Sequence, residues 1–172
     1  MIKAAIINVT GYAGIELARL LHRHPDTELV QVTGRSASGQ KLGDVFPHLS
    51  DINLNVDEEI SASVDVVFSA LPQTASAEAL IPMVEKGVKS IDISADFRLK
   101  SASEYEEWYG VPHPKPQLLE TAAYGLPEIN KSEIKSSSLV ANPGCYPTAA
   151  LLALAPAVRE NIIGEDIIID AL

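Results

Sequence analysis

Two short segments of this 172-residue sequence hold residue types that could do chemistry together. The first is a glycine-containing segment, residues 8–14, and the second surrounds the single cysteine, Cys145. A glycine loop between a strand and a helix can bind the pyrophosphate of a dinucleotide on its free backbone N–H groups. A cysteine at the start of a helix can act as a nucleophile, because the helix dipole stabilises its thiolate. Together they would permit acyl transfer to sulfur followed by hydride delivery.

The glycine segment reads Asn8-Val9-Thr10-Gly11-Tyr12-Ala13-Gly14, a dinucleotide-binding pattern with asparagine in place of the first glycine. Asparagine is among the residues that best tolerate a positive φ, so the turn can still form. The backbone that would bind the cofactor comprises Thr10, Gly11, Tyr12, Ala13 and Gly14. The alternative is a tight strand-to-helix turn without a ligand.

The end of the next predicted strand indicates which dinucleotide would bind. Thr33 is followed by Gly34, Arg35 and Ser36, with no acidic residue before Asp44. A guanidinium can pair with a 2′-phosphate, and the hydroxyl groups of Ser36 and Ser38 can donate further hydrogen bonds. These residues favour NADP, unless Arg35 is simply a solvated loop residue.

Cys145 follows Pro143 and Gly144 and precedes Pro147, which suits the first turn of a helix. The unpaired N–H groups there could also stabilise an oxyanion. The alternative is a small buried cysteine with a packing role.

The elements that must position these residues alternate between strands and helices. Apolar, β-branched runs predict buried parallel strands, and apolar residues at helical spacing predict helices between them. This rhythm predicts a doubly wound parallel sheet with helices on both faces. We expect a polar loop over 34–55, strands at 2–7, 29–33, 64–70, 88–93, 138–141 and 167–169, and helices at 12–22, 74–86, 101–109, 129–136 and 148–159.

Composition excludes several kinds of partner. The 13 basic and 23 acidic residues give a formal charge of −10, which disfavours binding to nucleic acid or to an anionic membrane surface. The longest apolar stretch, residues 149–158, is too short to cross a bilayer, and the N-terminus does not resemble a secretory signal. We therefore expect a cytoplasmic protein with a small-molecule substrate. The sequence has no His/Cys cluster with metal-ligand spacing, so we expect no metal.

Asp96 and Arg98 follow a predicted strand at its carboxyl end. They could fix a loop near the active site, or they could form an internal ion pair that shapes only their own loop. None of the four histidines has a spacing that links it to Cys145, so the sequence identifies no acid/base partner.

Five motifs, in this order, resemble the N-acetyl-gamma-glutamyl-phosphate reductase family, within the semialdehyde dehydrogenase superfamily. They cover essentially the whole chain and are Thr10-Gly11-Tyr12-Ala13-Gly14-Ile15-Glu16, Gly34-Arg35-Ser36, Ser94-Ala95-Asp96-Phe97-Arg98-Leu99, Tyr124-Gly125-Leu126-Pro127-Glu128 and Asn142-Pro143-Gly144-Cys145-Tyr146-Pro147-Thr148. The sequence departs from the family pattern in two places: Asn8 stands for glycine, and Gln73-Thr74 stands for His-Gly after Leu71-Pro72.

The resemblance implies NADPH-dependent reduction of an N-acetylglutamyl acyl phosphate to the semialdehyde, with release of phosphate, in arginine biosynthesis. Cys145 would form the thioester, and Asn142 would support the substrate or its loop. Family members are longer and form homo-oligomers through a second domain that carries the catalytic histidine. We therefore expect a Rossmann-type NADP-binding domain over 1–144, and over 145–172 the nucleophile helix with the start of a largely missing domain, inactive by itself.

Two other functions stay open. The first is a sister reductase that acts on aspartyl phosphate or on a carrier-linked aminoadipyl phosphate; Tyr146-Pro147-Thr148 argues against the aspartyl form. The second is a non-catalytic NADP-binding module.

Overall fold

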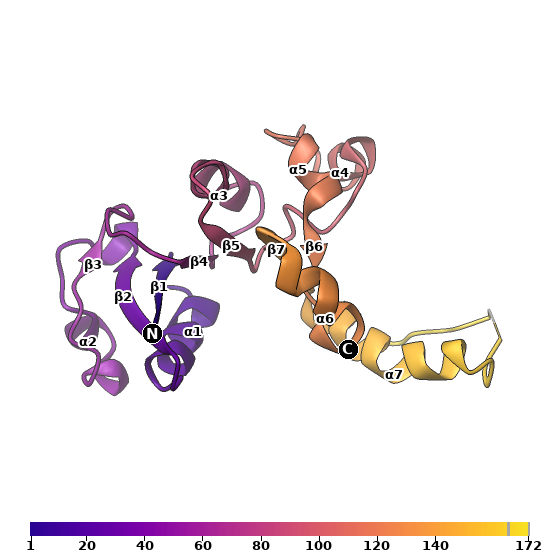
Figure 1. The fold of residues 1–172 in the computed structure, drawn as a ribbon, viewed down its shortest axis with the longest axis horizontal. Coiled ribbons are helices and arrows are strands. Elements are labelled where there is room, and N and C mark those ends of the chain that lie inside the picture. Colours follow the sequence, from indigo (N-terminus) through magenta and orange to yellow (C-terminus); the bar gives the residue numbers. More distant parts are fainter. Residues whose placement is uncertain (165, 172) are drawn as a thin grey trace.

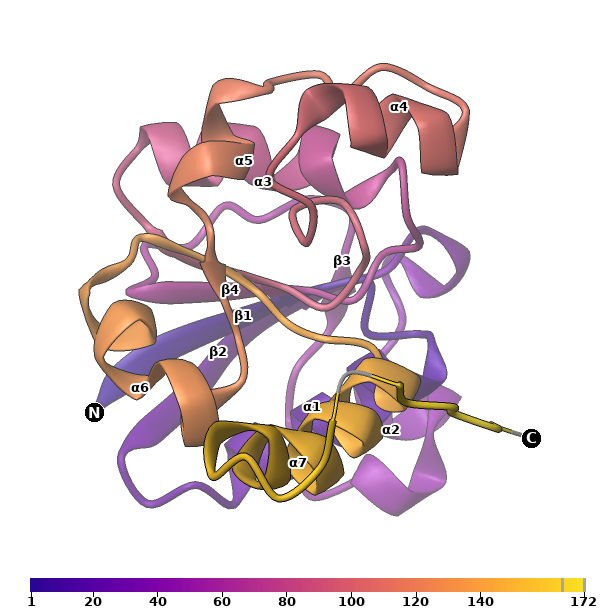
Figure 2. The same cartoon turned by 90° about the vertical axis from the view of Figure 1, so that its right-hand side faces the viewer.

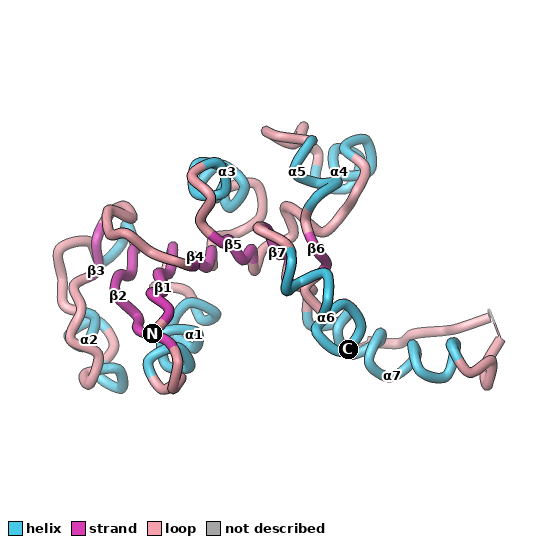
Figure 3. Tube along the Cα trace, viewed as in Figure 1, coloured by secondary structure: helices cyan, strands magenta, loops and turns pink. Residues whose placement is uncertain are grey.

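The structure is a computed structural model that describes residues 1–164 and 166–171. Its centre is one parallel sheet of seven strands in the order β3-β2-β1-β4-β5-β7-β6, which crosses Figure 3 in magenta. The strands are β1 (Ile2–Ile7), β2 (Thr27–Thr33), β3 (Val56–Asp57), β4 (Val66–Ser69), β5 (Lys89–Asp92), β6 (Ala123–Tyr124) and β7 (Leu139–Ala141). The expected doubly wound parallel sheet is confirmed.

Helices cover both faces of the sheet (Figures 1 and 2). On one side lie α1 (Tyr12–His22), α2 (Leu42–Val45) and α6 (Pro127–Ser136), and on the other lie α3 (Ser76–Glu85), α4 (Ala102–Tyr109) and α5 (Gln117–Thr121). Each face has its own apolar core. One packs α1 and α2 on the sheet around Ile6, Ala18 and Leu42, and the other packs α3, α4 and α5 around Val67 and Leu80. The core thus holds the strand ends in fixed positions.

The order of the strands reverses between β1 and β4. The chain runs outward from β1 through β2 to β3, then returns to place β4 on the other side of β1. In an open parallel sheet, the carboxyl ends of the strands at such a reversal enclose the crevice where ligands bind. The glycine loop leaves β1 at this point.

Several boundaries differ from the sequence prediction. The expected loop 34–55 contains two short 3-10 helices, η1 (Arg35–Ala37) and η2 (Pro47–Leu49), besides α2. Neither α5 nor β6 was expected, and the last helix, α7 (Cys145–Arg159), begins three residues early.

The expected strand at 167–169 is wrong, since residues 166–171 have no regular structure. A strand needs a neighbour for its backbone hydrogen bonds, and no strand of the described chain pairs with this isoleucine run. Helix α7 projects from the body at the lower right of Figure 1, and none of its residues is fully buried.

Candidate active site

Asn8 joins the ends of β1 and β4 at the point where the strand order reverses. Its φ of 65° confirms the expected positive φ. Its side-chain Nδ2 donates to the carbonyl oxygen of Ala70 at 2.9 Å, and its Oδ1 accepts from Thr10 Oγ1 at 3.2 Å. A glycine could make neither of these side-chain bonds. The asparagine therefore keeps the turn and adds a tie between the two strands that flank the crevice.

The two glycines of the loop have different roles. A Cβ on Gly14 would lie 2.4 Å from the carbonyl oxygen of Asn8 and 2.7 Å from Val9 Cα, so Gly14 lets α1 pack closely against β1. A Cβ on Gly11 would meet nothing nearer than Asn8 Nδ2 at 3.7 Å. Packing within the described chain therefore does not require glycine at position 11, whereas the close approach of a pyrophosphate does.

The start of α1 is suited to an anion. Gly11 is its N-cap and offers no side chain to bond the N–H groups of the first turn. Tyr12 and Ala13 are exposed, and the first turn carries no acidic residue. The free N–H groups and the positive end of the helix dipole thus face outward, where the expected cofactor would bring its phosphates.

A cleft of about 730 Å³ opens beside this loop. Three residues expected to bind the cofactor, Thr10, Arg35 and Ser36, line it, and Ser36 Oγ donates to Thr10 Oγ1 at 3.3 Å. The other expected cofactor-binding residues do not line it; they are Gly11, Tyr12, Ala13, Gly14 and Ser38, the C-cap of η1. In the described chain, Arg35 is exposed and forms no ion pair, so its guanidinium is available to a ligand.

The remaining walls of the cleft were not expected from the sequence. Helix α3 and the turn before it supply an apolar wall, and the loop after β3 supplies an acidic edge. Asn8, Thr33 and Gly34 belong to the segments that the sequence analysis singled out, whereas the lining residues that it missed are Ile7, Glu58, Glu59, Ile60, Leu71, Ala75, Glu78, Ala79, Pro82, Met83 and Lys86. The signal available for them was weak, because most are ordinary helix or loop residues.

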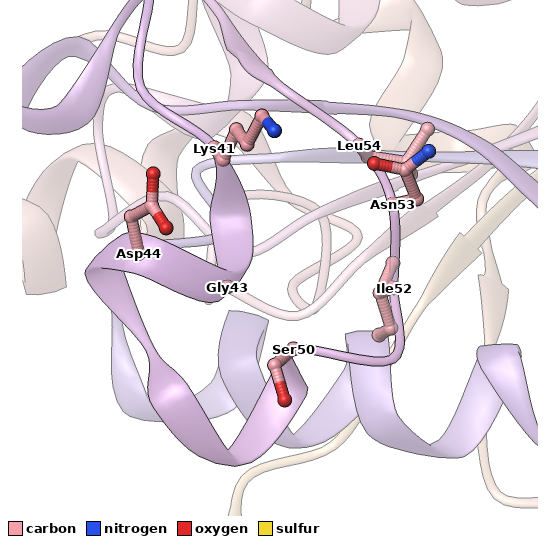
Figure 4. A pocket seen from close by; sticks show the side chains of 7 residues that line it. All are labelled: Lys41, Gly43, Asp44, Ser50, Ile52, Asn53 and Leu54. Carbon is pink, nitrogen blue, oxygen red and sulfur yellow. The ribbon is translucent and has the colours of Figure 1, made fainter.

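A second, smaller cavity of about 220 Å³ lies between α2 and the chain that leads to β3 (Figure 4). Its lining residues all fall within 41–54, and they include none of the residues expected to do chemistry. It therefore lies apart from the candidate site.

Cys145 is exposed and is the first residue of α7, directly after its N-cap, Gly144. No side chain caps the N-terminus of this helix. The preceding turn is fixed by backbone and side-chain bonds: Asn142 N–H donates to the carbonyl oxygen of Asp92 at 2.8 Å, and Asn142 Nδ2 donates to that of Pro143 at 3.1 Å. Cys145 thus follows a turn that is fixed by hydrogen bonds, with free N–H groups beside it.

Arg98 contributes to the same turn. Its Nε donates to the carbonyl oxygen of Asn142 at 2.8 Å, and its Nη2 donates to that of Ile93 at 2.9 Å. Nη1 lies 3.1 Å from the place that a Cβ on Gly144 would occupy. A guanidinium therefore stands next to the residue before Cys145.

Asp96 acts elsewhere and forms no ion pair with Arg98. Its fully buried carboxylate accepts from the backbone N–H groups of Thr74 at 2.7 Å and Ala77 at 2.9 Å, and from Tyr105 OH at 3.0 Å. It thereby holds the start of α3 and the turn that borders the cleft. Thr74 has a φ of 70°, at the position where the family pattern has glycine.

Two more buried groups support this edge of the sheet. Burial raises the pKa of Asp92, whose carboxyl accepts from Ser94 Oγ at 2.8 Å and from Ser94 N–H at 3.0 Å. Burial lowers the pKa of His113, whose ring packs on Phe97 and Tyr105. His113 Nδ1 accepts from Lys115 N–H at 3.1 Å, while its Nε2 is buried without a partner in the described chain.

The glycine loop and Cys145 lie at the same edge of the sheet, because every strand runs in the same direction. Strands β4 and β5 separate β1 from β7, which places the two features roughly 14 Å apart at ordinary strand spacing. A ligand that begins at the glycine loop and extends across β4 and β5 would therefore approach Cys145.

These features define a class: an open α/β domain with a dinucleotide-type crevice and a cysteine at the same sheet edge. The comparison with protein families agrees, because residues 3–137 match the model described as semialdehyde dehydrogenase, NAD binding domain. The chain belongs to this family.

Individual relatives are similar over nearly the whole chain. An N-acetyl-gamma-glutamyl-phosphate reductase from Dehalococcoides mccartyi is 55% identical over 169 residues, covering 98% of this chain and 50% of the relative. One from Halothermothrix orenii is 50% identical, covering 99% and 51%. The chain thus spans about half the length of the curated relatives it matches.

Solved structures show the same fold. An aspartate semialdehyde dehydrogenase from Candida albicans, crystallised with NADP, aligns with a TM-score of 0.71 at 18% identity over 93% of this chain and 47% of that one. Among residues 1–164 and 166–171, no helix is both long and apolar enough to span a membrane.

Proposed function

We propose that this chain is the nucleotide-binding and nucleophile-bearing part of an enzyme that reduces N-acetyl-gamma-glutamyl phosphate to the semialdehyde with NADPH, in cytoplasmic arginine biosynthesis. The observation that carries the proposal is an exposed Cys145 at the start of α7, on the same sheet edge as the glycine loop. The names of the relatives support this substrate in preference to aspartyl or aminoadipyl phosphate.

Each part of the site has a chemical task. The Cys145 thiolate attacks the acyl carbon, the bond from carbon to the phosphate oxygen breaks, and a thioester forms as phosphate leaves. N–H groups at the start of α7, with the Arg98 guanidinium beside Gly144, stabilise the oxyanion. When bound, NADPH would supply the hydride that converts the thioester to the aldehyde and returns the thiolate. The segment 10–14 binds the pyrophosphate, and Arg35 and Ser36 bind the 2′-phosphate.

Residues 1–144 would form the NADP-binding domain, with 145–172 as the nucleophile helix and the beginning of a second domain. Helix α7 and the following segment expose apolar side chains that a single domain would bury, among them Leu152, Val158 and Ile162. In the whole protein, the second domain would cover this face, complete the substrate pocket, supply the acid/base and form the contact of a homo-oligomer.

The experiment compares the 172-residue chain with its Cys145→Ser variant. Calorimetry with NADPH and NADH measures cofactor binding, and phosphorylation of the semialdehyde with NADP⁺ and inorganic phosphate measures turnover. We expect both chains to bind NADPH and the 172-residue chain to turn over negligibly. Absence of nucleotide binding would contradict the cofactor site, and turnover that survives Cys145→Ser would contradict the nucleophile.

A further inference from the structure

Gln31 is a polar side chain in an otherwise apolar part of β2, and it is 5% exposed. The pairing of β1 with β2 shifts between Ala4 and Ala5, so that Ala5 pairs with Gln31 after the irregularity. Because side chains alternate along a strand, Gln31 shares its face of the sheet with Thr33, which lines the cleft. Its carboxamide therefore lies beneath the wall of the nucleotide cleft.

This carboxamide holds the loop that follows β3. Its Oε1 accepts from the backbone N–H groups of Ser61 and Ala62, both at 2.9 Å. Its Nε2 donates to Asp57 Oδ2 at 2.6 Å and lies 3.2 Å from the carbonyl oxygen of Glu59. Because two N–H donors face one atom, that atom must be the oxygen, which fixes the orientation of the amide.

Hydrogen bonds from Gln31, together with the packing of Ile60 and Val64 on the core, hold residues 58–64 in place. Within the part of the chain that the structure describes, Gln31 makes all the hydrogen bonds that join residues 58–64 to other elements. Burying the Gln31 carboxamide without hydrogen-bond partners would cost free energy. The side chain therefore holds the loop, and the loop in turn satisfies the side chain.

The loop places two carboxylates beside the expected 2′-phosphate site. Gly34 N–H donates to the carbonyl oxygen of Asp57 at 3.0 Å, so β2 and β3 are still paired at the residues that precede Arg35 and Glu58. Both line the cleft, together with Glu59. The negative charges of Glu58 and Glu59 thus reduce the positive potential that Arg35 creates where a 2′-phosphate would bind.

We propose that Gln31 is a positioning residue for nucleotide specificity: it fixes residues 58–62 so that Glu58 and Glu59 weaken the preference of the cleft for a 2′-phosphate over a 2′-hydroxyl. The proposal rests on the proposed function, since it requires that the cleft bind nicotinamide dinucleotides. Gln31 itself touches no ligand and acts through the loop.

The test is a double-mutant cycle on dissociation constants for NADPH and NADH. The pair Glu58→Gln and Glu59→Gln should tighten NADPH binding about threefold and change NADH binding less, with the gain diminishing at high salt. In a Gln31→Met background, where the loop is released, the same pair should change NADPH binding by less than about 1.5-fold. Gln40→Met, the same replacement at an exposed glutamine, is the control and should leave the threefold gain intact.

Amide hydrogen exchange provides a readout that does not depend on a nucleotide. Ser61 and Ala62 should lose protection in Gln31→Met and keep it in Gln40→Met. If Gln31→Met does not fold, Ala62→Pro removes one N–H donor at an exposed position and should also reduce the gain. An equal gain in both backgrounds, with NADPH still bound, would overturn this inference alone. If the wild-type chain binds neither dinucleotide, the proposed function fails and this inference fails with it.

Discussion

The Nε of Arg98 donates to the carbonyl oxygen of Asn142 at 2.8 Å and ties the loop after β5 to the turn that leads into Cys145. These residues are 44 positions apart in the sequence. The second bond of the guanidinium, to the carbonyl oxygen of Ile93, secures it to its own loop. Arg98 therefore holds the turn that precedes Cys145 against the loop after β5.

Replacing Arg98 by methionine should loosen this turn and remove a positive charge from the start of α7. Because hydrogen bonds from a charged group are lost, the free energy of unfolding should fall by about 2 kcal/mol in urea titrations. Alkylation of Cys145 by iodoacetamide at pH 7 should slow roughly threefold. Arg159→Met, at the other end of α7, is the control; an Arg98 variant that behaves like it would contradict the assignment.

Thr74 carries strain that glycine would relieve. A β-branched residue at a φ of 70° is disfavoured, and its side chain is exposed, so nothing in the packing offsets this cost. Thr74→Gly should raise the free energy of unfolding by about 1 kcal/mol. Thr121→Gly, within α5, should lower it. Urea unfolding of both variants is the measurement, and a Thr74→Gly chain less stable than the wild type would show that the turn is unstrained.

Arg35 should distinguish the two dinucleotides. Arg35→Ala should weaken NADPH binding about tenfold and NADH binding much less, because only NADPH carries the 2′-phosphate. Calorimetry of the variant should be compared with that of Arg23→Ala, an exposed arginine at the end of α1 and outside the cleft. Equal losses for both nucleotides would mean that Arg35 does not meet the 2′-phosphate.

His113 should make stability depend on pH in a mildly acidic window. Burial lowers its pKa in the folded chain, an effect that the nearby Asp96 partly offsets. The unfolded chain therefore takes up a proton first as the pH falls below the ordinary histidine value of about 6.5. Stability is full above that pH and is lost as the pH falls through the lowered pKa.

Denaturation of the wild type and His113→Asn between pH 7.5 and about 5 measures this contribution. The asparagine can still accept from Lys115 N–H but does not titrate in this range. The variant should be less stable at neutral pH, yet its stability should change less as the pH falls. Parallel pH profiles would show that His113 does not cause the dependence.

The sequence predicted the parts of the fold that depend on local patterns. The apolar run of β1 and the helical spacing of α1 were sufficient to locate the glycine loop between them. The short elements were not predicted, because the five residues of α5 and the two of β6 are too few to show a periodic pattern of apolar residues. The isoleucine run at 167–169 has strand propensity, but no partner strand in the described chain.

The site residues that directly follow a strand could be predicted from the sequence. Those whose hydrogen-bond partners are distant in the sequence could not. Cys145, Thr10 and Arg35 each follow a strand, so their common edge could be anticipated. Asp96 and Arg98 are near neighbours of opposite charge, yet they separate, because their partners come from the start of α3 and from the Asn142 turn. Gln31 offered one signal, a polar residue within a buried strand, but its partners lie 26 to 31 residues away.

Binding of NADPH by a Gly11→Ala chain tests the central claim most directly. The added Cβ has room in the chain itself, at 3.7 Å from its nearest neighbour, so the variant should fold with a loss of less than about 1 kcal/mol. Gly14→Ala, whose Cβ would collide with backbone, should instead be strongly destabilised. If the loop binds a pyrophosphate, Gly11→Ala should lose at least about tenfold in NADPH affinity by calorimetry while remaining folded. A folded Gly11→Ala chain that binds NADPH as tightly as the wild type would contradict the claim.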